Sequence, residues 1–216
     1  MSPIAKLLRL TFYLLYHSLA PTYDYVADLV SLGQWRAWIQ EIIPYLQGTH
    51  LLELGHGPGH LQRFLLDLGL LPFGLDESAP MGRLARRNLR KSGYTQIALT
   101  RGLAQYLPFP ANAFSTVVAT FPSDYIFDPR TLSEIRRVLR PKGRLVVLLS
   151  VCPSDNTMPA RFFAWLFRIT GQVVQSDRES ANRLRVPFER AGWTTTIEYL
   201  NSHGGRLAIL LAWNLN

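Results

Sequence analysis

The stretch from Leu51 to Gly69 constrains the fold more than any other part of the chain. It reads LLELGHGPGHLQRFLLDLG, an apolar run followed by glycines at positions 55, 57 and 59 and then by an amphipathic pattern. A second apolar run ends in a single carboxylate, Asp76. A buried strand, a glycine turn, a helix and a second strand ending in an acid form a nucleotide-binding half of an open α/β sheet. The segment predicts a cofactor site, with a tight turn that holds no ligand as the alternative.

The glycine spacing separates two kinds of cofactor. A dinucleotide fingerprint, GxGxxG, would need its third glycine at position 60, where His60 stands. This spacing disfavours a nicotinamide-dependent dehydrogenase, and competition between cofactors would test that alternative. The alternating glycines, with Glu53 two residues before the first, instead resemble the first motif of class I S-adenosylmethionine-dependent methyltransferases.

The resemblance implies that S-adenosylmethionine is the cofactor and that Glu53 serves its amino group or orders the loop. Glycines let the backbone adopt positive φ and approach a ligand closely. Asp76 can accept from both ribose hydroxyls, and Glu77 is a weaker candidate for that role. The predicted cofactor-binding residues are Glu53, Gly55, His56, Gly57, Gly59, Asp76, Glu77, Gly102, Leu103 and Ala104.

Two later segments extend the resemblance over most of the chain. GLAQYLPFPANAFSTVVATF, residues 102–121, matches the end of the family's third strand and its fourth strand, and TLSEIRRVLRPKGRLVVLLS, residues 131–150, matches the following helix and fifth strand. The chain departs from the family at Leu103, where an aspartate usually receives the adenine amino group, and at Ser115, where an aspartate usually follows the phenylalanine. An unreplaced acceptor costs about 1–3 kcal/mol, so we expect Leu103 to weaken cofactor binding.

The pattern along the chain predicts a doubly wound α/β fold with N-terminal accessory helices. Strands alternate with helices, which implies a parallel sheet with right-handed crossovers and a ligand site at the carboxyl ends of its strands. The predicted strands are 51–55, 71–76, 95–100, 115–120, 143–151, 193–200 and 205–213. The predicted helices are 59–69, 78–92, 130–139, 157–170 and 180–191, with two more before residue 48, one of them running from Trp35 to Leu46. A terminal hairpin on a five-stranded parallel core is the seven-stranded, mostly parallel, Rossmann-like sheet that the resemblance implies.

Length and composition indicate one domain over residues 1–216, with a helical prologue or lid at 1–47 and an α/β core at 48–216. A single cysteine, Cys152, excludes an intramolecular disulfide and suits a reducing cytosol. The apolar N-terminus is too short and too polar to span a bilayer securely and lacks a secretory cleavage site. These features predict a cytoplasmic protein, with peripheral contact to a membrane as an extension of that prediction.

The net charge of +8 fits nucleic acid, an anionic membrane or an ordinary basic enzyme. Arginines follow helical spacing after Asp76 and surround a later helix end, and solvated helix faces explain them most simply. Neither an RNA-binding signature nor a zinc finger accompanies them in the sequence, so nucleic acid is the weaker interpretation, and we predict no metal site.

Candidate catalytic residues follow the fourth strand. Asp124 and Tyr125 stand in TFPSDY, where this family commonly presents groups that face the substrate. The prologue YDYVADLVSLGQWRAWI resembles that of ubiquinone/menaquinone C-methyltransferases and related phospholipid N-methyltransferases. We therefore expect a methyltransferase that acts on a small, apolar or lipid-like acceptor.

Two alternatives remain open. TFPSDY lacks the Asn/Asp-Pro-Pro-Tyr/Phe type motif that a nucleic-acid or protein methyltransferase would need. A non-catalytic or weakly active cofactor-binding scaffold is the stronger alternative, and turnover with any acceptor would exclude it.

Overall fold

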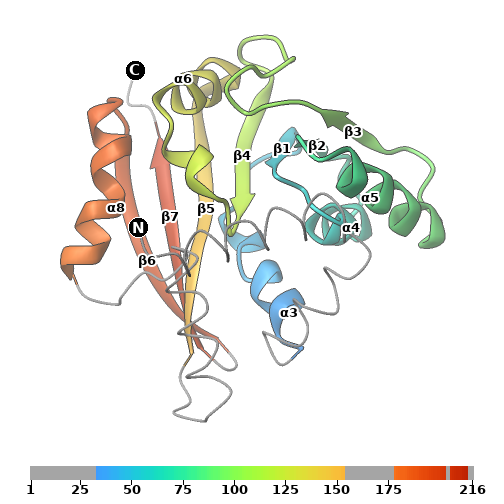
Figure 1. Cartoon of the computed structure of the whole chain (residues 1–216), viewed down its shortest axis with the longest axis horizontal. Helices are drawn as coiled ribbons and strands as arrows, with labels where there is room; N and C mark the ends of the chain where they lie inside the picture. The colour runs from blue at the N-terminus through green and yellow to red at the C-terminus, as the bar shows by residue number, and fades with distance from the viewer. Residues whose placement is uncertain (1–32, 154–177, 203–204, 214–216) are drawn as a thin grey trace, which may run out of the picture.

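The computed structural model describes residues 33–153, 178–202 and 205–213 (Figure 1). Their strands form one seven-stranded sheet in the order β3-β2-β1-β4-β5-β7-β6, in which β7 is antiparallel to both of its neighbours and the other pairs are parallel. The strands are β1 (Leu51–Leu54), β2 (Phe73–Asp76), β3 (Ala98–Arg101), β4 (Phe114–Thr120), β5 (Leu139–Pro153), β6 (Thr194–Ser202) and β7 (Gly205–Trp213). This architecture confirms the predicted doubly wound, mostly parallel sheet.

Helices cover both faces of the sheet. They are α3 (Trp35–Gln40), η2 (Ile43–Tyr45), α4 (His60–Asp67), α5 (Ala79–Lys91), η3 (Asp124–Phe127), α6 (Pro129–Val138) and α8 (Arg178–Arg190). Side chains alternate between the two faces along a strand. Leu51 therefore packs with α3 and α4 in one core cluster, and Leu52 packs with α6 and α8 in the other. Glu53 shares its face with Leu51 and lies under α4.

Local sequence signals set where the helices around the site begin. The Ser78 hydroxyl accepts from the backbone N–H of Met81 at the start of α5, and Asp128 accepts from the N–H of Arg130 at the start of α6. Each cap precedes a proline in the first turn, Pro80 or Pro129, whose missing N–H costs nothing there. These caps fix the helix starts beside the carboxyl edge of the sheet.

The structure corrects several predicted boundaries. The helix expected from Trp35 to Leu46 is split into α3 and η2, because Pro44 has no N–H to donate to Gln40. Strand β5 begins at Leu139 rather than at residue 143, and its register against β4 shifts between Phe114 and Thr116. Strand β3 is shorter than predicted and lies at 98–101.

Some predictions fall on residues outside the described ranges. These are the first helix of the prologue and lid, within residues 1–32, and the aromatic helix at 157–170. In the part of the chain that the structure does describe, no helix has the length and apolarity needed to cross a membrane.

Candidate functional site

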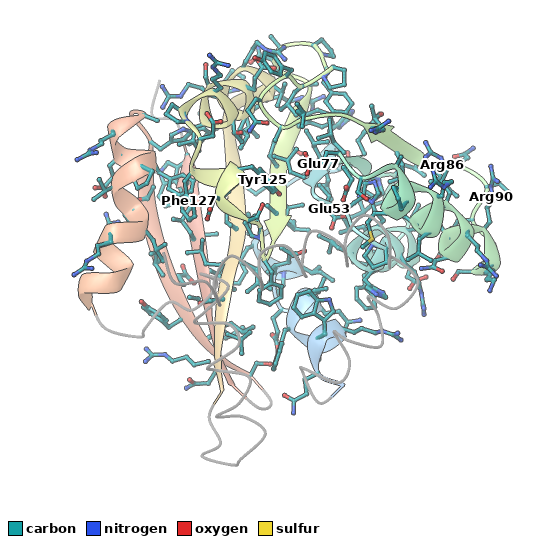
Figure 2. The ribbon with its side chains drawn as sticks, in the orientation of Figure 1. Glu53, Glu77, Arg86, Arg90, Tyr125 and Phe127 are labelled. Carbon is teal, nitrogen blue, oxygen red and sulfur yellow. The ribbon has the colours of Figure 1, made fainter. Side chains whose placement is uncertain are left out.

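The carboxyl ends of β1, β2 and β4 bring most of the predicted site residues to one edge of the sheet. A loop of residues 55–59 connects β1 to α4, Asp76 ends β2, and η3 follows β4. Figure 2 shows Glu53 from β1, Glu77 directly after β2, and Tyr125 and Phe127 from η3. The topology therefore places the glycine motif and the predicted catalytic residues together, as the fold predicted.

The three loop glycines are required for three different reasons. All have positive φ, at 69° for Gly55, 50° for Gly57 and 87° for Gly59, which other residues adopt at a cost. An added Cβ at Gly55 would lie 2.8 Å from the Tyr125 hydroxyl, and one at Gly59 would lie 3.1 Å from the Cβ of Ala85 on α5. An added Cβ at Gly57 would meet no atom of the described residues within 4 Å. Of the three glycines, Gly57 alone therefore has open space beside its Cα among the residues that the structure describes.

Asp76 joins the loop to the start of α5. Its Oδ2 accepts from the backbone N–H of Gly57 at 2.9 Å, and its Oδ1 accepts from that of Ser78 at 2.8 Å. Each carboxylate oxygen has two lone-pair directions, so one stays available on each oxygen. The half-buried carboxylate can hold the loop and still accept from a vicinal pair of hydroxyls.

Glu53 is buried beneath the loop rather than exposed to a ligand. Only 1% of its surface is accessible, and its Oε2 accepts from the Gln62 side-chain N–H at 2.8 Å. Burial, opposed by that hydrogen bond and assisted by the charge of Asp76, raises the pKa of Glu53 to about 8. Of the two roles expected for Glu53, this geometry favours ordering the loop. Gln62 was missed in the sequence, although a polar residue between the apolar positions of α4 could have indicated it.

His56 has a structural contact within the loop. Its ring is buried, and Nδ1 lies 2.8 Å from the carbonyl oxygen of Gly57, so Nδ1–H donates to that oxygen. Burial lowers the pKa of His56, the charge of Asp76 opposes this effect, and Arg86 adds to it. A neutral imidazole held to the backbone stabilises the loop and does not add a positive charge there.

The segment after β3 provides an apolar surface instead of an acid. Gly102 donates its N–H to the Asp76 carbonyl at 3.1 Å, which fixes the segment beside β2. Leu103 is 47% exposed and Ala104 is buried. The side-chain amide of Gln105 donates to Asp128 at 3.2 Å. No carboxylate therefore comes from positions 103–105.

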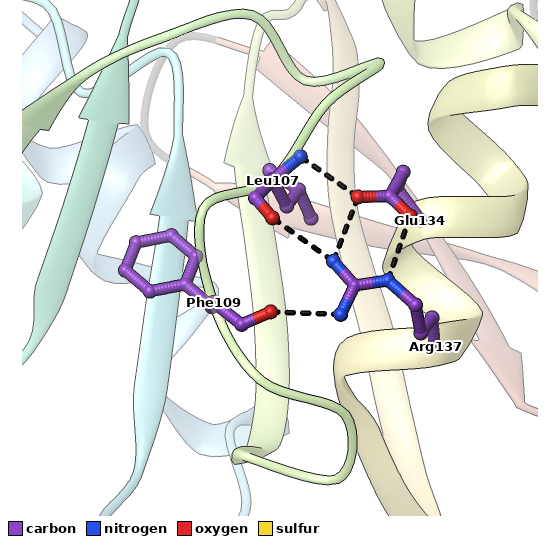
Figure 3. A network of polar contacts seen from close by, with 4 residues as sticks. All are labelled: Leu107, Phe109, Glu134 and Arg137. Atoms are coloured by element: carbon purple, nitrogen blue, oxygen red, sulfur yellow. Dashed lines mark hydrogen bonds and ion pairs between the residues drawn. The ribbon is translucent and has the colours of Figure 1, made fainter.

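A salt-bridged pair holds this segment against α6 (Figure 3). The Arg137 guanidinium donates to the carbonyls of Leu107 and Phe109 at 2.9 and 2.7 Å and to Glu134 at 2.7 Å. Glu134 also accepts from the backbone N–H of Leu107 at 2.8 Å. The hydrogen bond from Arg137 lowers the pKa of Glu134, so the pair stays charged.

The other predicted residues differ in how closely they approach the loop. The Tyr125 hydroxyl donates to the carbonyl of Leu54, the last residue of β1, at 3.1 Å. Asp124 begins η3 and is exposed, and Glu77 is exposed after β2. Ser115 lies at the amino end of β4, where its hydroxyl donates to the carbonyls of Gln47 and His50. Ser115, where the chain departs from the family pattern, therefore lies at the opposite end of β4 from the residues predicted to bind the cofactor.

Phe121 directly follows β4 and was missed in the sequence. Its φ is +47°, and its ring stacks on Trp35 with a centroid separation of 4.3 Å. A left-handed conformation is unfavourable for a residue with a Cβ, and such conformations gather at functional edges. In the sequence, the only indication that the backbone turns sharply at Phe121 is its position at the end of a predicted strand and before Pro122.

The described residues can be compared with the donor sets that hold metal ions. Within the described ranges, no three His, Cys, Asp or Glu side chains are grouped to hold an ion. The open space at Gly57 beside the Asp76 carboxylate instead fits a ligand with a ribose and a polar tail.

Solved structures share this fold. An S-adenosylmethionine-dependent methyltransferase from Aquifex aeolicus has a TM-score of 0.61 at 15% identity, covering 81% of this chain and 88% of that one. Phosphoethanolamine N-methyltransferase 2 of Haemonchus contortus, in complex with S-adenosyl-L-methionine, has a TM-score of 0.56 at 15% identity, covering 85% and 53%. These likenesses support the Rossmann-like methyltransferase fold.

Sequence comparison identifies the family. The demethylmenaquinone methyltransferase of Symbiobacterium thermophilum is 34% identical over 161 residues, which are 70% of this chain and 63% of that enzyme. The ubiquinone/menaquinone biosynthesis C-methyltransferase UbiE of Saccharophagus degradans is 29% identical over 220 residues, covering 90% and 87%. A family model, described as the ubiE/COQ5 methyltransferase family, matches residues 11–213. The chain therefore belongs to this family and is an S-adenosylmethionine-dependent methyltransferase, as the glycine motif predicted.

Proposed function

We propose that this enzyme methylates a ring carbon of a reduced quinone that carries an apolar chain. The observation that carries the proposal is the match to quinone methyltransferases, which extends over residues 11–213. By their names, the two relatives act on demethylmenaquinone and in ubiquinone and menaquinone biosynthesis. A quinol with an apolar chain is a more specific acceptor than the small, apolar or lipid-like molecule expected from the sequence.

The proposed cofactor-binding site is the surface between the glycine loop and residues 102–104. S-adenosylmethionine supplies an electrophilic methyl group on a positively charged sulfur. The open approach at Gly57 accommodates the tail of the ligand, and Asp76 accepts from its ribose hydroxyls. Leu103 offers its exposed apolar side chain to the adenine. Buried Glu53 and His56 keep the loop in shape from below.

Asp124 is the proposed catalytic base, and Tyr125 is the proposed positioning residue beside it. The Asp124 carboxylate accepts the proton of a ring hydroxyl, which raises the electron density on the neighbouring ring carbon. That carbon would take the methyl group as the carbon–sulfur bond of the cofactor breaks, with S-adenosylhomocysteine as the leaving group, and would then lose its own proton to water. Tyr125 is held by its hydrogen bond to Leu54 and so fixes η3 against the glycine loop. Holding donor and acceptor in line supplies much of the rate in such a displacement.

The proposal includes peripheral contact with a membrane, since an apolar acceptor dissolves in lipid. Residues 1–32 carry an apolar helical pattern and several tyrosines, and they would cover the acceptor. Deleting residues 1–20 should leave cofactor affinity unchanged and impair methylation of a long-chain quinol.

The test is turnover with labelled cofactor. The full chain is incubated with methyl-labelled S-adenosylmethionine and a demethylated menaquinol of short isoprenoid chain. The product is analysed by mass spectrometry and carbon NMR. We expect a new carbon–methyl bond on the ring and a large loss of turnover in Asp124→Asn at unchanged cofactor affinity. Methylation at oxygen would contradict the proposal, and cofactor binding without turnover on any quinol or lipid would favour the scaffold alternative.

A further inference from the structure

One face of α5 carries a concentration of positive charge that the proposed reaction does not use. The opposite face of this helix buries Met81, Ala85 and Leu89 against the sheet and α4. Five cationic side chains line a shallow hollow of about 490 Å³ on the outer side: Arg83, Arg86, Arg87, Arg90 and Lys91. Figure 2 shows Arg86 and Arg90 at the outer edge of the molecule. We call these five residues the basic face of α5.

The charges on the basic face of α5 repel one another. Helical neighbours lie three or four residues apart, and like charges at that spacing destabilise a helix. Arg83 neighbours Arg86 and Arg87, Arg87 neighbours Arg90 and Lys91, and Arg86 neighbours Arg90. The sequence of α5 contains neither aspartate nor glutamate, so no acid within the helix separates these charges.

Intramolecular contacts relieve little of this repulsion. Arg86 donates to the carbonyl of Leu99 on β3, and no ion pair involves the five side chains among the described residues. The helix dipole favours cations in the last turn, which accounts for Arg90 and Lys91. It does not account for Arg83, which stands nearer the start of α5. An anionic partner from outside the chain would relieve the repulsion of all five.

We infer that the basic face of α5 docks on the surface of an anionic phospholipid bilayer. The helix is about 20 Å long, and its charges form a row rather than an enclosed pocket, which suits an array of lipid phosphates. Its sequence, APMGRLARRNLRK, has no aromatic side chain on which a nucleic-acid base could stack. The choice of a bilayer rests on the proposed function, since an apolar quinol is collected from lipid.

The position of α5 connects this docking surface to the site. The helix begins at Ala79, three residues after Asp76, and the Ser78 N–H that precedes it donates to the Asp76 carboxylate. A bilayer along α5 would therefore lie within about one helix length of the cofactor edge. Docking there would raise the local concentration of a membrane-dissolved acceptor beside the site.

The test is co-sedimentation of the full chain with vesicles. Phosphatidylcholine vesicles with one third phosphatidylglycerol are compared with pure phosphatidylcholine at low and high salt. The variant R83Q/R87Q/R90Q should lose about a hundredfold in affinity for the anionic vesicles, and salt should weaken binding by the unaltered chain. The control R63Q/R140Q/R190Q removes the same number of charges from other surfaces and should keep most of the binding.

Three outcomes would overturn the inference: no binding of the unaltered chain to anionic vesicles, an equal loss in both variants, or an α5-dependent affinity for duplex DNA or free phosphate that vesicles do not share. Turnover on a short-chain quinol dissolved in detergent separates this test from that of the proposed function. R83Q/R87Q/R90Q should retain that turnover. Absence of turnover in every form would refute the proposed function, whereas vesicle binding reports on α5 alone.

Discussion

Replacing Gly55 by alanine should destabilise the fold through Tyr125. The added Cβ would stand 2.8 Å from the Tyr125 hydroxyl, in a residue whose φ is +69°. The left-handed conformation costs about 1–2 kcal/mol for a residue with a Cβ. Displacing the hydroxyl from the Leu54 carbonyl costs about 1 kcal/mol more. Gly55→Ala should therefore lower the free energy of unfolding by about 2–3 kcal/mol.

A double-mutant cycle isolates the contact. Tyr125→Phe removes the same hydroxyl and should cost about 1 kcal/mol alone. In the double variant that hydrogen bond is lost only once, so the combined loss should be about 1 kcal/mol smaller than the sum of the single losses. Urea unfolding with unchanged m-values measures each term.

Gly69 provides the matched control for the cycle. Its φ is +76°, and within the described part of the chain an added Cβ there would meet nothing within 4 Å. Gly69→Ala should therefore cost the backbone strain alone and should add to Tyr125→Phe without coupling. Additivity in the Gly55 cycle, within about 0.5 kcal/mol, would refute the assignment of Gly55 to the space that Tyr125 fills.

Three further predictions concern single side chains. The pKa of Glu53 is raised to about 8 in the folded protein, so Glu53 ionises at lower pH in the unfolded chain. The free energy of unfolding of the natural protein, relative to that of Glu53→Gln, should therefore fall by a few kcal/mol as pH rises from about 5 to 8 and stay level above that, as measured by thermal unfolding. A difference between the two proteins that does not change with pH would contradict the burial of Glu53. Leu103→Asp should increase the affinity for S-adenosylhomocysteine relative to its inosine analogue by about tenfold in calorimetry. An unchanged affinity ratio would mean that another group already accepts a hydrogen bond from the adenine amino group. Arg137→Gln should cost about 1–2 kcal/mol in urea unfolding, since it removes four hydrogen bonds that are exposed or only partly buried. A loss below about 0.5 kcal/mol would show that these hydrogen bonds do not hold the segment.

The arrangement of the sheet followed from the sequence because several local signals agree. The glycine turn, the acid at Asp76 and the alternation of strands and helices each require the same parallel topology. The last two strands could be predicted as a hairpin because two glycines, Gly204 and Gly205, stand where they meet, and β6 and β7 do pair antiparallel. Boundaries were less accurate where tertiary pairing decides, as at Leu139, because strand length depends on a partner strand that local sequence does not specify.

The site could be predicted by position but not by contact. Gly55 was expected to make room for a ligand, yet its space is taken by Tyr125 from a segment 70 residues later. Glu53 was expected to serve the cofactor or to order the loop, and its hydrogen bond with Gln62 from α4 was not predicted. The left-handed backbone of Phe121 and the hydrogen bonds of Ser115 to Gln47 and His50 could not be predicted from the sequence either. Side-chain partners brought together by the fold are not encoded in the spacing of a motif.

Calorimetric titration of the full chain with S-adenosylhomocysteine tests the central claim most directly, that the edge at Gly57 and Asp76 holds the cofactor. The natural protein should bind, and Gly57→Val and Asp76→Ala should each lose at least about tenfold in affinity, or about 1.4 kcal/mol. Gly69→Ala, which strains the backbone away from the site, should bind as the natural protein does. Absence of binding by the folded natural protein at millimolar ligand, or unchanged affinity in both site variants, would contradict the claim.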